Sequence, residues 1–416
     1  MTIVIKAHRL LDGSGAPPRD NGVVIVQDGI ITAVGPAEAT AIPDGATVVD
    51  LPDDETVLPG LIDSHHHPPL CGYMRDYLLC MNDPYEQLFL RALRNFQITL
   101  RAGITTVRCV GEKGFVDVLY RQAVEQGVAL GPRIKTCTRG FRTERGHGFL
   151  GTPFATIADL RRGLVENAEA GADFAKLFVT GTVLIDGNMP SFMARDEIEA
   201  AVETAHGLGH DVTVHAVGGQ GLRDCLEGGV DCIEHGYFID DAAIAAMRAR
   251  GVWLVVTSGV FFDDDAIDNH HSPEARDAFR AQRSIVRERL ARAVAAGVNI
   301  AVGTDGLVGK VANEVRFLTE IGMPPLQALC AATIQGARLL RLEDTVGSLT
   351  VGKRADIISV RGNPAEDVAA LRQVRLVMKD GVRLDPILDQ MDTLARESAA
   401  SIHRHARPLV AAPARA

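Results

Sequence analysis

Short apolar runs alternate along the middle of the chain with longer segments in which apolar residues recur at helical spacing. The longer segments, such as 195–208, 241–250 and 280–296, place their apolar residues on one face, as amphipathic helices do. The apolar runs predict eight strands, at residues 57–67, 105–110, 133–138, 174–180, 211–215, 232–235, 252–257 and 299–304. Eight strand-then-helix units in succession favour a (β/α)8 TIM barrel of the α/β class over an open sheet.

Glycines mark the ends of several predicted helices. Each stands just before the next strand, where a helix often stops in a left-handed conformation that glycine adopts freely. These positions are Gly103, Gly171, Gly209, Gly251 and Gly297. A further helix is predicted at 324–340, after the eighth unit.

Both ends of the chain show a different pattern, in which short β-branched runs are separated by turn signals. An Asp28-Gly29 turn, for example, separates the apolar runs 23–26 and 30–35, which predicts a β-hairpin. The two ends are therefore expected to pair into one small β-domain. The expected organisation is a β-sandwich built from 1–57 and 346–384, a barrel at 58–345, and a C-terminal extension at 385–416.

Length, charge and cysteine content narrow the class of protein. A chain of 416 residues fits a large barrel with one smaller domain attached. A formal net charge of -10 argues against binding to nucleic acid or to an anionic membrane surface. No apolar stretch approaches the roughly 20 residues that span a bilayer, and the N-terminus lacks the features of a secretory signal. Seven cysteines without a CxxC pair favour reduced thiols and a cytoplasmic location.

Groups that bind metal ions or transfer protons stand at the ends of the predicted barrel strands, where TIM barrels place their catalytic groups. Because residues i and i+2 of a strand share a face, His65 and His67 can bind one ion while His66 faces away. Neutral imidazoles completed by a carboxylate suit zinc. The candidates are His65 and His67 on the first strand, Lys176 on the fourth, His215 on the fifth, His235 on the sixth and Asp305 after the eighth.

Lys176 is unusual because it lies inside the apolar run 174–180. A buried ammonium is costly unless it is paired or chemically modified. One interpretation is an ion pair with a carboxylate of a neighbouring strand, and the other is a modified lysine at a metal site.

Five motifs occur in a fixed order along the chain. They are Pro59-Gly60-Leu61-Ile62-Asp63-Ser64-His65-His66-His67, Val214-His215-Ala216, Ile233-Glu234-His235-Gly236, Gly303-Thr304-Asp305, and a closing segment from Gly347-Ser348-Leu349 to Gly352-Lys353-Arg354-Ala355-Asp356. Together they resemble the amidohydrolase superfamily over nearly the whole chain. The pattern is most similar to prolidase-like dipeptidases, metallo-carboxypeptidases and N-acyl amino acid hydrolases. Thr180-Gly181-Thr182 departs from the Gly-Gly pair that many prolidase-like members have after strand four. The resemblance therefore does not define the shape of the pocket near this segment.

The resemblance implies a hydrolase with two divalent metal ions, which the ligand types suggest are zinc. One ion would be held by His65, His67 and Asp305 and the other by His215 and His235, with carbamylated Lys176 bridging the two. The implied reaction is cleavage of an amide, peptide-like bond in a small molecule such as a dipeptide or N-acyl amino acid, by a hydroxide that bridges the ions. Asp305 would also carry a proton from the water to the leaving amine. The resemblance further implies a homo-oligomer.

Substrate recognition rests on less specific signals. Arg142 and Arg145 follow the third strand, where a guanidinium can bind a substrate carboxylate, although a solvated loop fits the same pattern. His147 and Tyr237 resemble positions that contact the carbonyl or tetrahedral intermediate in prolidase-like members. The segment 261–271, with an acidic run, is predicted to be a long loop that acts as a lid or is only hydrated.

Two other functions fit parts of the pattern. One is a deaminase or cyclic-amide hydrolase of the same superfamily, but such deaminases usually carry a glutamate shortly after the strand-five histidine. Here Ala216-Val217-Gly218-Gly219-Gln220 follows His215, without a carboxylate. The other is a non-catalytic scaffold, which would have been free to lose the ligand set that this chain retains.

Overall fold

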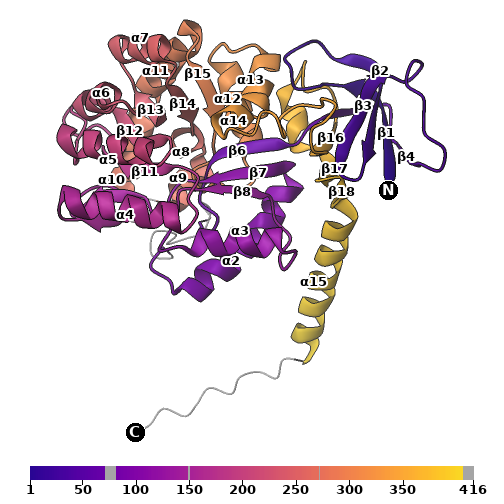
Figure 1. Cartoon of the computed structure of the whole chain (residues 1–416), viewed down its shortest axis with the longest axis horizontal. Helices are drawn as coiled ribbons and strands as arrows, with labels where there is room; N and C mark the ends of the chain where they lie inside the picture. Colours follow the sequence, from indigo (N-terminus) through magenta and orange to yellow (C-terminus); the bar gives the residue numbers. More distant parts are fainter. Residues whose placement is uncertain (71–80, 149, 271, 406–416) are drawn as a thin grey trace.

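The computed structural model describes residues 1–70, 81–148, 150–270 and 272–405. The amide of Asp173 donates to the carbonyl of Thr136 (2.7 Å) and that of Thr304 to the carbonyl of His65 (3.0 Å), which joins the two sheets of the barrel at both edges. The predicted TIM barrel is confirmed (Figure 1). Its eight strands are β6 (Leu61–His66), β7 (Ile104–Cys109), β8 (Arg133–Thr136), β11 (Ala175–Phe178), β12 (Val212–Gly218), β13 (Cys232–Phe238), β14 (Trp253–Val256) and β15 (Asn299–Val302).

Helices surround the barrel and alternate with its strands (Figure 1). Local signals fix their ends: the Asp240 side chain accepts a hydrogen bond from the amide of Ala243 at the start of α7, and Gly251 ends that helix in the left-handed conformation. Gly297 ends α11 in the same way. The helices are α2 (Tyr85–Arg101), α3 (Val116–Glu125), α4 (Ile157–Glu169), α5 (Arg195–Gly207), α6 (Gly219–Gly228), α7 (Asp241–Arg250), α11 (Arg283–Ala296), α12 (Val311–Glu320), α13 (Pro325–Ala331) and α14 (Ile334–Leu339).

A second, smaller unit contains strands from both ends of the chain, which lie side by side in Figure 1. Buried aliphatic side chains such as Ile5, Val24 and Ile357 form its core. The β-domain expected from both ends is confirmed; its strands join in a single sheet, ordered β18-β17-β16-β5-β1-β2-β3 with β4 also on β1, where the sequence suggested a sandwich. The strands are β1 (Thr2–Leu10), β2 (Arg19–Gln27), β3 (Ile30–Pro36), β4 (Thr47–Asp50), β5 (Glu55–Pro59), β16 (Ile357–Arg361), β17 (Val374–Lys379) and β18 (Val382–Arg383), with a short 3-10 helix, η1 (Val368–Arg372), between β16 and β17.

The predicted strand 57–67 is divided at Gly60. β5 pairs with β16 and β1 in the small sheet, whereas β6 pairs with β7 in the barrel. Gly60 packs so closely on Thr105 that a Cβ at this position would lie 2.2 Å from Thr105 Oγ1, a contact that only glycine avoids. The chain thus passes from one sheet to the other through a single residue, just before it delivers His65 to the barrel.

Three other segments differ from the expectation. The helix predicted at 324–340 is divided into α13 and α14 at Thr333. Two short strands, β9 (Phe141–Thr143) and β10 (Thr152–Phe154), follow β8. The described part of 261–271, expected as a loop, lies within the short helices α8 (Gly259–Phe262) and α9 (Asp264–His270), and α10 (Pro273–Ala281) follows.

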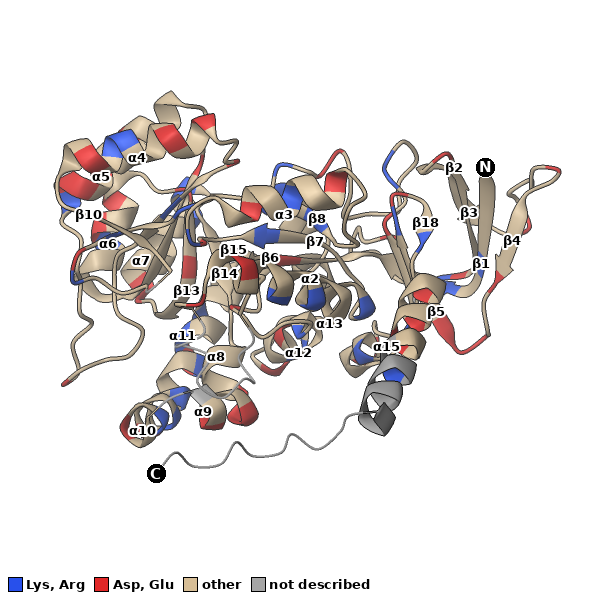
Figure 2. Ribbon diagram, turned by 90° about the horizontal axis from the view of Figure 1, so that it is seen from below, with Lys and Arg blue, Asp and Glu red and all other residues tan. Residues whose placement is uncertain are grey.

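The C-terminal helix α15 (Asp385–His405) projects from the small sheet (Figure 1). Arg101 of α2 pairs with Asp389 (3.0 Å) and Asp392 (2.8 Å) at its base. The outer helices contain charged residues of both signs, blue and red in Figure 2. Within the described chain, no helix combines the length and the apolar character needed to cross a membrane. Cys71 and Cys80 lie outside the described residues; each described cysteine is a free thiol.

Candidate metal centre

Six polar residues converge at the carboxyl ends of the barrel strands. Between ring centres, His67 and His65 are 5.4 Å apart, His65 and His235 4.7 Å, and His235 and His215 4.4 Å. The structure therefore brings the sequence-predicted ligands together. They are His65 at the end of β6 with His67 just beyond it, Lys176 on β11, His215 on β12, His235 on β13 and Asp305 after β15.

His65, His67 and Asp305 form the tightest part of this cluster. Their ligand atoms all lie within 4.8 Å of one another. Nε2 of His65 is 3.3 Å from Oδ1 of Asp305, and Nε2 of His67 is 3.5 Å from the same atom. His66 is directed elsewhere, with Nδ1 3.1 Å from Oδ2 of Asp63. Two imidazoles and one carboxylate thus point at a common position, as ligands of one metal ion do.

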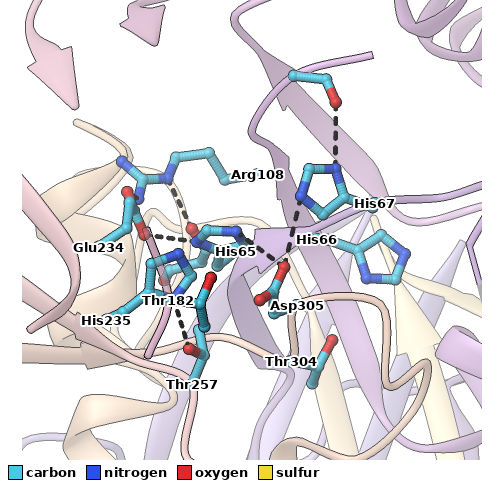
Figure 3. A network of polar contacts seen from close by, with 12 residues as sticks. His65, His66, His67, Arg108, Thr182, Glu234, His235, Thr257, Thr304 and Asp305 are labelled. Atoms are coloured by element: carbon cyan, nitrogen blue, oxygen red, sulfur yellow. Dashed lines mark hydrogen bonds and ion pairs between the residues drawn. The ribbon is translucent and has the colours of Figure 1, made fainter. Parts of the chain in front are cut away.

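The second ring nitrogen of His65 is held by a buried carboxylate (Figure 3). Nδ1 donates to Oε2 of Glu234 at 2.7 Å, and Arg108 and Thr213 donate to the same carboxylate. Burial opposes ionisation of this group, but Arg108 and His65 hold the pKa of Glu234 well below its usual range. A carboxylate behind a metal-binding imidazole fixes its tautomer and orientation. Neither Glu234 nor Arg108 was among the residues predicted for this site, although charged residues inside two apolar strands were a signal of this role.

Two other histidines are oriented in the same manner. Nδ1 of His67 is 3.1 Å from the carbonyl oxygen of Gly111 and 3.3 Å from Oε1 of Glu112. Nδ1 of His235 is 2.7 Å from Oγ1 of Thr257. Each ring therefore uses Nδ1 for a fixed protein partner, which leaves Nε2 as the atom that can bind a metal ion.

Lys176 is fully buried beside this cluster, where its Nζ lies 5.0 Å from the centre of the Phe178 ring. Its Nζ has no hydrogen-bond partner among the described residues. Burial lowers the pKa of Lys176, because a charged ammonium without a partner is unstable in such surroundings. The arrangement gives no support to a simple structural ion pair.

The backbone is strained at two of the candidate ligands. His235 (φ 76°) and Asp305 (φ 49°) both have the left-handed conformation, which costs a non-glycine residue roughly 1–2 kcal/mol. At His235 the turn breaks the alternation of the strand, so that Glu234 and His235 both reach His65. Strain of this kind concentrates at functional sites.

The predicted substrate-facing residues differ in their surroundings. The ring of His147 lies 4.3 Å from that of His215, and its Nε2 is 3.3 Å from Oγ1 of Thr182. Tyr237 is fully buried, with its hydroxyl 2.6 Å from Oγ1 of Thr257. His147 thus borders the cluster directly, whereas Tyr237 supports the residue that orients His235.

The two predicted arginines lie farther out. Arg142 belongs to β9 and donates to the backbone carbonyls of Gly151 (3.1 Å), Thr143 (3.1 Å) and Glu144 (2.8 Å). Arg145 is exposed. In this structure the Arg142 guanidinium shapes its own segment, and Arg145 is free to turn toward a bound molecule.

The segment after β14, which forms α8 to α10, is held in place by ion pairs and by aromatic packing. Asp264 pairs with Arg283 (2.7 Å) and Asp268 with Arg280 (2.6 Å). Phe261 packs on Tyr237, with ring centres 4.6 Å apart. Asp264 of the acidic run therefore joins α9 to α11.

Acid should destabilise the metal-free protein, because the fold holds several histidines in their neutral form. Burial lowers the pKa of His147 to about 4 and that of His67 to about 3. The unfolded chain takes up these protons near pH 6.5, so stability present above pH 6.5 is lost as the pH falls toward 4. For His147 alone the loss is about 3 kcal/mol. Thermal unfolding of chelator-treated protein at several pH values measures it.

A matched pair of variants separates this effect from general acid denaturation. His147→Asn should flatten the pH dependence, whereas His8→Asn, at an exposed position of β1, should leave it unchanged. Equal slopes for both variants would show that folding does not lower the pKa of His147.

Comparison with known proteins shows which sequences this chain resembles. A model of the amidohydrolase family matches residues 56–384. The ochratoxinase of Aspergillus niger is 24% identical over 409 residues, covering 90% of this chain and 84% of that protein. A 5-methylthioadenosine/S-adenosylhomocysteine deaminase of Moorella thermoacetica is 25% identical over 398 residues, covering 86% of this chain and 85% of that protein.

Among solved structures, a Xaa-Pro dipeptidase with methionine bound in its active site is similar to this chain. It is 31% identical, with a TM-score of 0.82, and the match covers 92% of this chain and 99% of the dipeptidase. The match runs through the small sheet as well as the barrel, since it leaves only a small part of either chain outside.

Proposed function

This chain belongs to the amidohydrolase family, and from that premise we propose that it is a binuclear metal-dependent hydrolase that cleaves an amide bond in a dipeptide or N-acyl amino acid. The observation that carries the proposal is the convergence of His65, His67 and Asp305 on one position. The Nδ1 atom of each of the two histidines is already held by a protein partner. The unpartnered Nζ of Lys176 beside them is the reason for proposing two ions rather than one.

The residues present fit two divalent ions and a carbamate on Lys176. A neutral amine combines with carbon dioxide to give a carbamate and a proton, and burial favours the neutral amine. The added carboxylate would supply the partner that Nζ lacks and a ligand for each ion. His215 and His235, whose ring centres are 4.4 Å apart, would complete the second set. Zinc is the proposed metal because imidazole and carboxylate ligands suit it.

When bound, such ions lower the pKa of water and polarise a carbonyl group. The protein residues supply the rest of the chemistry. Burial opposes ionisation of Asp305, but His65 and the neighbouring histidines hold the pKa of this carboxyl group well below its usual range. Asp305 is therefore ionised, which is the form that can accept a proton from the attacking water and return it to the leaving amine. His147, next to His215, is placed to donate to the substrate carbonyl.

A hydrolysis screen of the zinc-loaded protein tests the proposal. Dipeptides and N-acyl amino acids would be compared with cyclic amides and amino-heterocycles, with release of amine or ammonia as the readout. Cleavage of a linear amide that carries a carboxylate is the expected result, in line with the similarity to a Xaa-Pro dipeptidase. Loss of cleavage on chelation and its return with zinc would assign it to the metal site.

Deamination is a second candidate because one relative is a deaminase. The segment after His215 offers no carboxylate near the strand end, since Val217 and Gly218 continue β12 and Gly219 begins α6. Ammonia release from an amino-heterocycle without cleavage of any linear amide would favour this candidate and contradict the proposal.

Replacing Arg145 by glutamine should raise KM for carboxylate substrates by roughly tenfold with little change in kcat, because one exposed ionic contact is lost. Arg142→Gln should have a similar effect and also lower the melting temperature, since Arg142 holds three carbonyls of its segment. Arg139→Gln is the matched control, because Arg139 instead contacts Glu166 of α4. An unchanged KM in both variants would remove this segment from substrate binding.

A further inference from the structure

The barrel contains a cavity of about 370 Å³ at the end opposite the candidate metal centre. Its lining includes Asp211 and Asp231, which precede β12 and β13, and Trp253, which begins β14. The candidate ligands His215 and His235 lie farther along β12 and β13, toward the carboxyl ends of these strands, so the two sites lie on opposite faces of the barrel. The volume is in the range of small-molecule binding sites, and no part of the proposed hydrolysis uses this cavity.

Two of the three acidic residues that line this cavity are paired with cations. Asp173 pairs with Lys135 (2.8 Å) and Asp211 with Arg341 (2.5 Å). The third carboxylate, Asp231, is 2.9 Å from Nε2 of His206 and accepts from the amide of Val212 (2.7 Å). Asp231 is thus the one carboxylate of the lining that has no lysine or arginine partner among the described residues.

Two arginines of the rim, Arg250 and Arg338, remain without a carboxylate. Among the described residues, Arg250 donates to the carbonyl of Leu226, and Arg338 donates to Oε1 of Gln335 (3.3 Å). Arg108, in the roof, is buried and committed to Glu234. The spare positive charge lies at the rim, where an anion can enter.

One wall of the cavity is apolar. Trp253 and Leu339 are partly buried and pack on the same small cluster of core residues, and Val252 and Leu340 continue this wall. An occupant that fits both features has an anionic head and an apolar body. Guanidinium groups match a carboxylate through paired hydrogen bonds.

We propose that this cavity is a binding site for a small organic carboxylate, with the carboxylate on Arg250 and Arg338 and the apolar body against Trp253 and Leu339. The proposal does not depend on the hydrolytic activity. Trp253 is the single tryptophan of the chain, so tryptophan fluorescence reports on this cavity and not on the metal centre.

Titration of the full-length protein with phenylacetate, followed by tryptophan fluorescence, tests the proposal. A saturable change is expected, with benzyl alcohol (no charge) and inorganic phosphate (no apolar body) binding at least about tenfold more weakly. Arg338→Gln should weaken phenylacetate binding by about tenfold, whereas Arg338→Lys, which keeps the charge, should weaken it less. Calorimetry on the same samples would detect binding that leaves the fluorescence unchanged.

Arg161→Gln is the matched control, because Arg161 lies on α4, pairs with Glu203 and does not line the cavity. Its affinity for phenylacetate should equal that of the unaltered protein. The proposal is overturned if phenylacetate produces no saturable signal by either method, or if Arg338→Gln and Arg250→Gln, shown by melting temperature to be folded, bind as tightly as the control. Hydrolytic activity enters none of these readouts.

Discussion

Replacing Lys176 by alanine is expected to leave a folded protein that binds one metal ion instead of two and has lost kcat/KM by roughly a thousandfold or more. The stability of the metal-free protein should hold, because the substitution removes a buried amine whose Nζ has no hydrogen-bond partner within the described chain. The loss of turnover should be large because both the bridging ligand and the second ion are removed together.

Metal analysis and intact-mass measurement check this expectation separately from activity. The unaltered protein should carry the added mass of one carbon dioxide under gentle conditions, and its second ion should depend on bicarbonate during loading. Lys6→Ala, on β1 of the small sheet, is the matched control and should retain both ions. Added propionate should partly restore the second ion in Lys176→Ala, because it supplies a carboxylate to the vacated space. Two ions and unchanged activity in Lys176→Ala would refute the carbamate and the binuclear model.

Regular strand geometry is the reason that much of the site was predictable from the sequence. The i, i+2 spacing of His65 and His67 places both on one face, and the structure directs both Nε2 atoms to Asp305. An ammonium inside an apolar strand also marked Lys176 as unusual, and the structure places this residue, fully buried, beside the histidines. In each case the position of the residue followed from a local sequence pattern and from the rule that TIM barrels carry their catalytic groups at the carboxyl ends of the strands.

Features that depend on irregular backbone or on distant contacts were not predictable. Glu234 and His235 are adjacent and would face opposite sides of a regular strand, but the left-handed turn at His235 lets both contact His65. The division of the first predicted strand at Gly60 depends on the close approach of Thr105, 45 residues later in the chain. The helices after β14 are fixed by pairs such as Asp264 with Arg283. Local periodicity carries no information about such long-range partners.

Replacing Asp305 by asparagine should lower kcat by roughly 10²–10⁴-fold while retaining more metal than Asp305→Ala does. Asparagine keeps an oxygen that can bind the ion near His65 and His67, but it cannot accept a proton, and proton transfer by a positioned group contributes about this much to a rate. The comparison of asparagine with alanine therefore separates the ligand role of Asp305 from its proton-transfer role. Metal content and kcat of both variants, measured side by side, are the required data.

The leaving group of the substrate identifies which proton transfer is lost. If Asp305 returns the proton to the leaving amine, an anilide, whose amine is weakly basic and leaves with little help, should lose less rate in Asp305→Asn than an alkyl amide does. Asp277→Asn, on α10, controls for the loss of one negative charge and should not discriminate between the two substrates. Equal losses for both substrates would restrict Asp305 to activating the water. Retention of kcat within about twofold, with both ions bound, would exclude it from proton transfer and direct attention to His147, which borders His215 at the same end of the barrel.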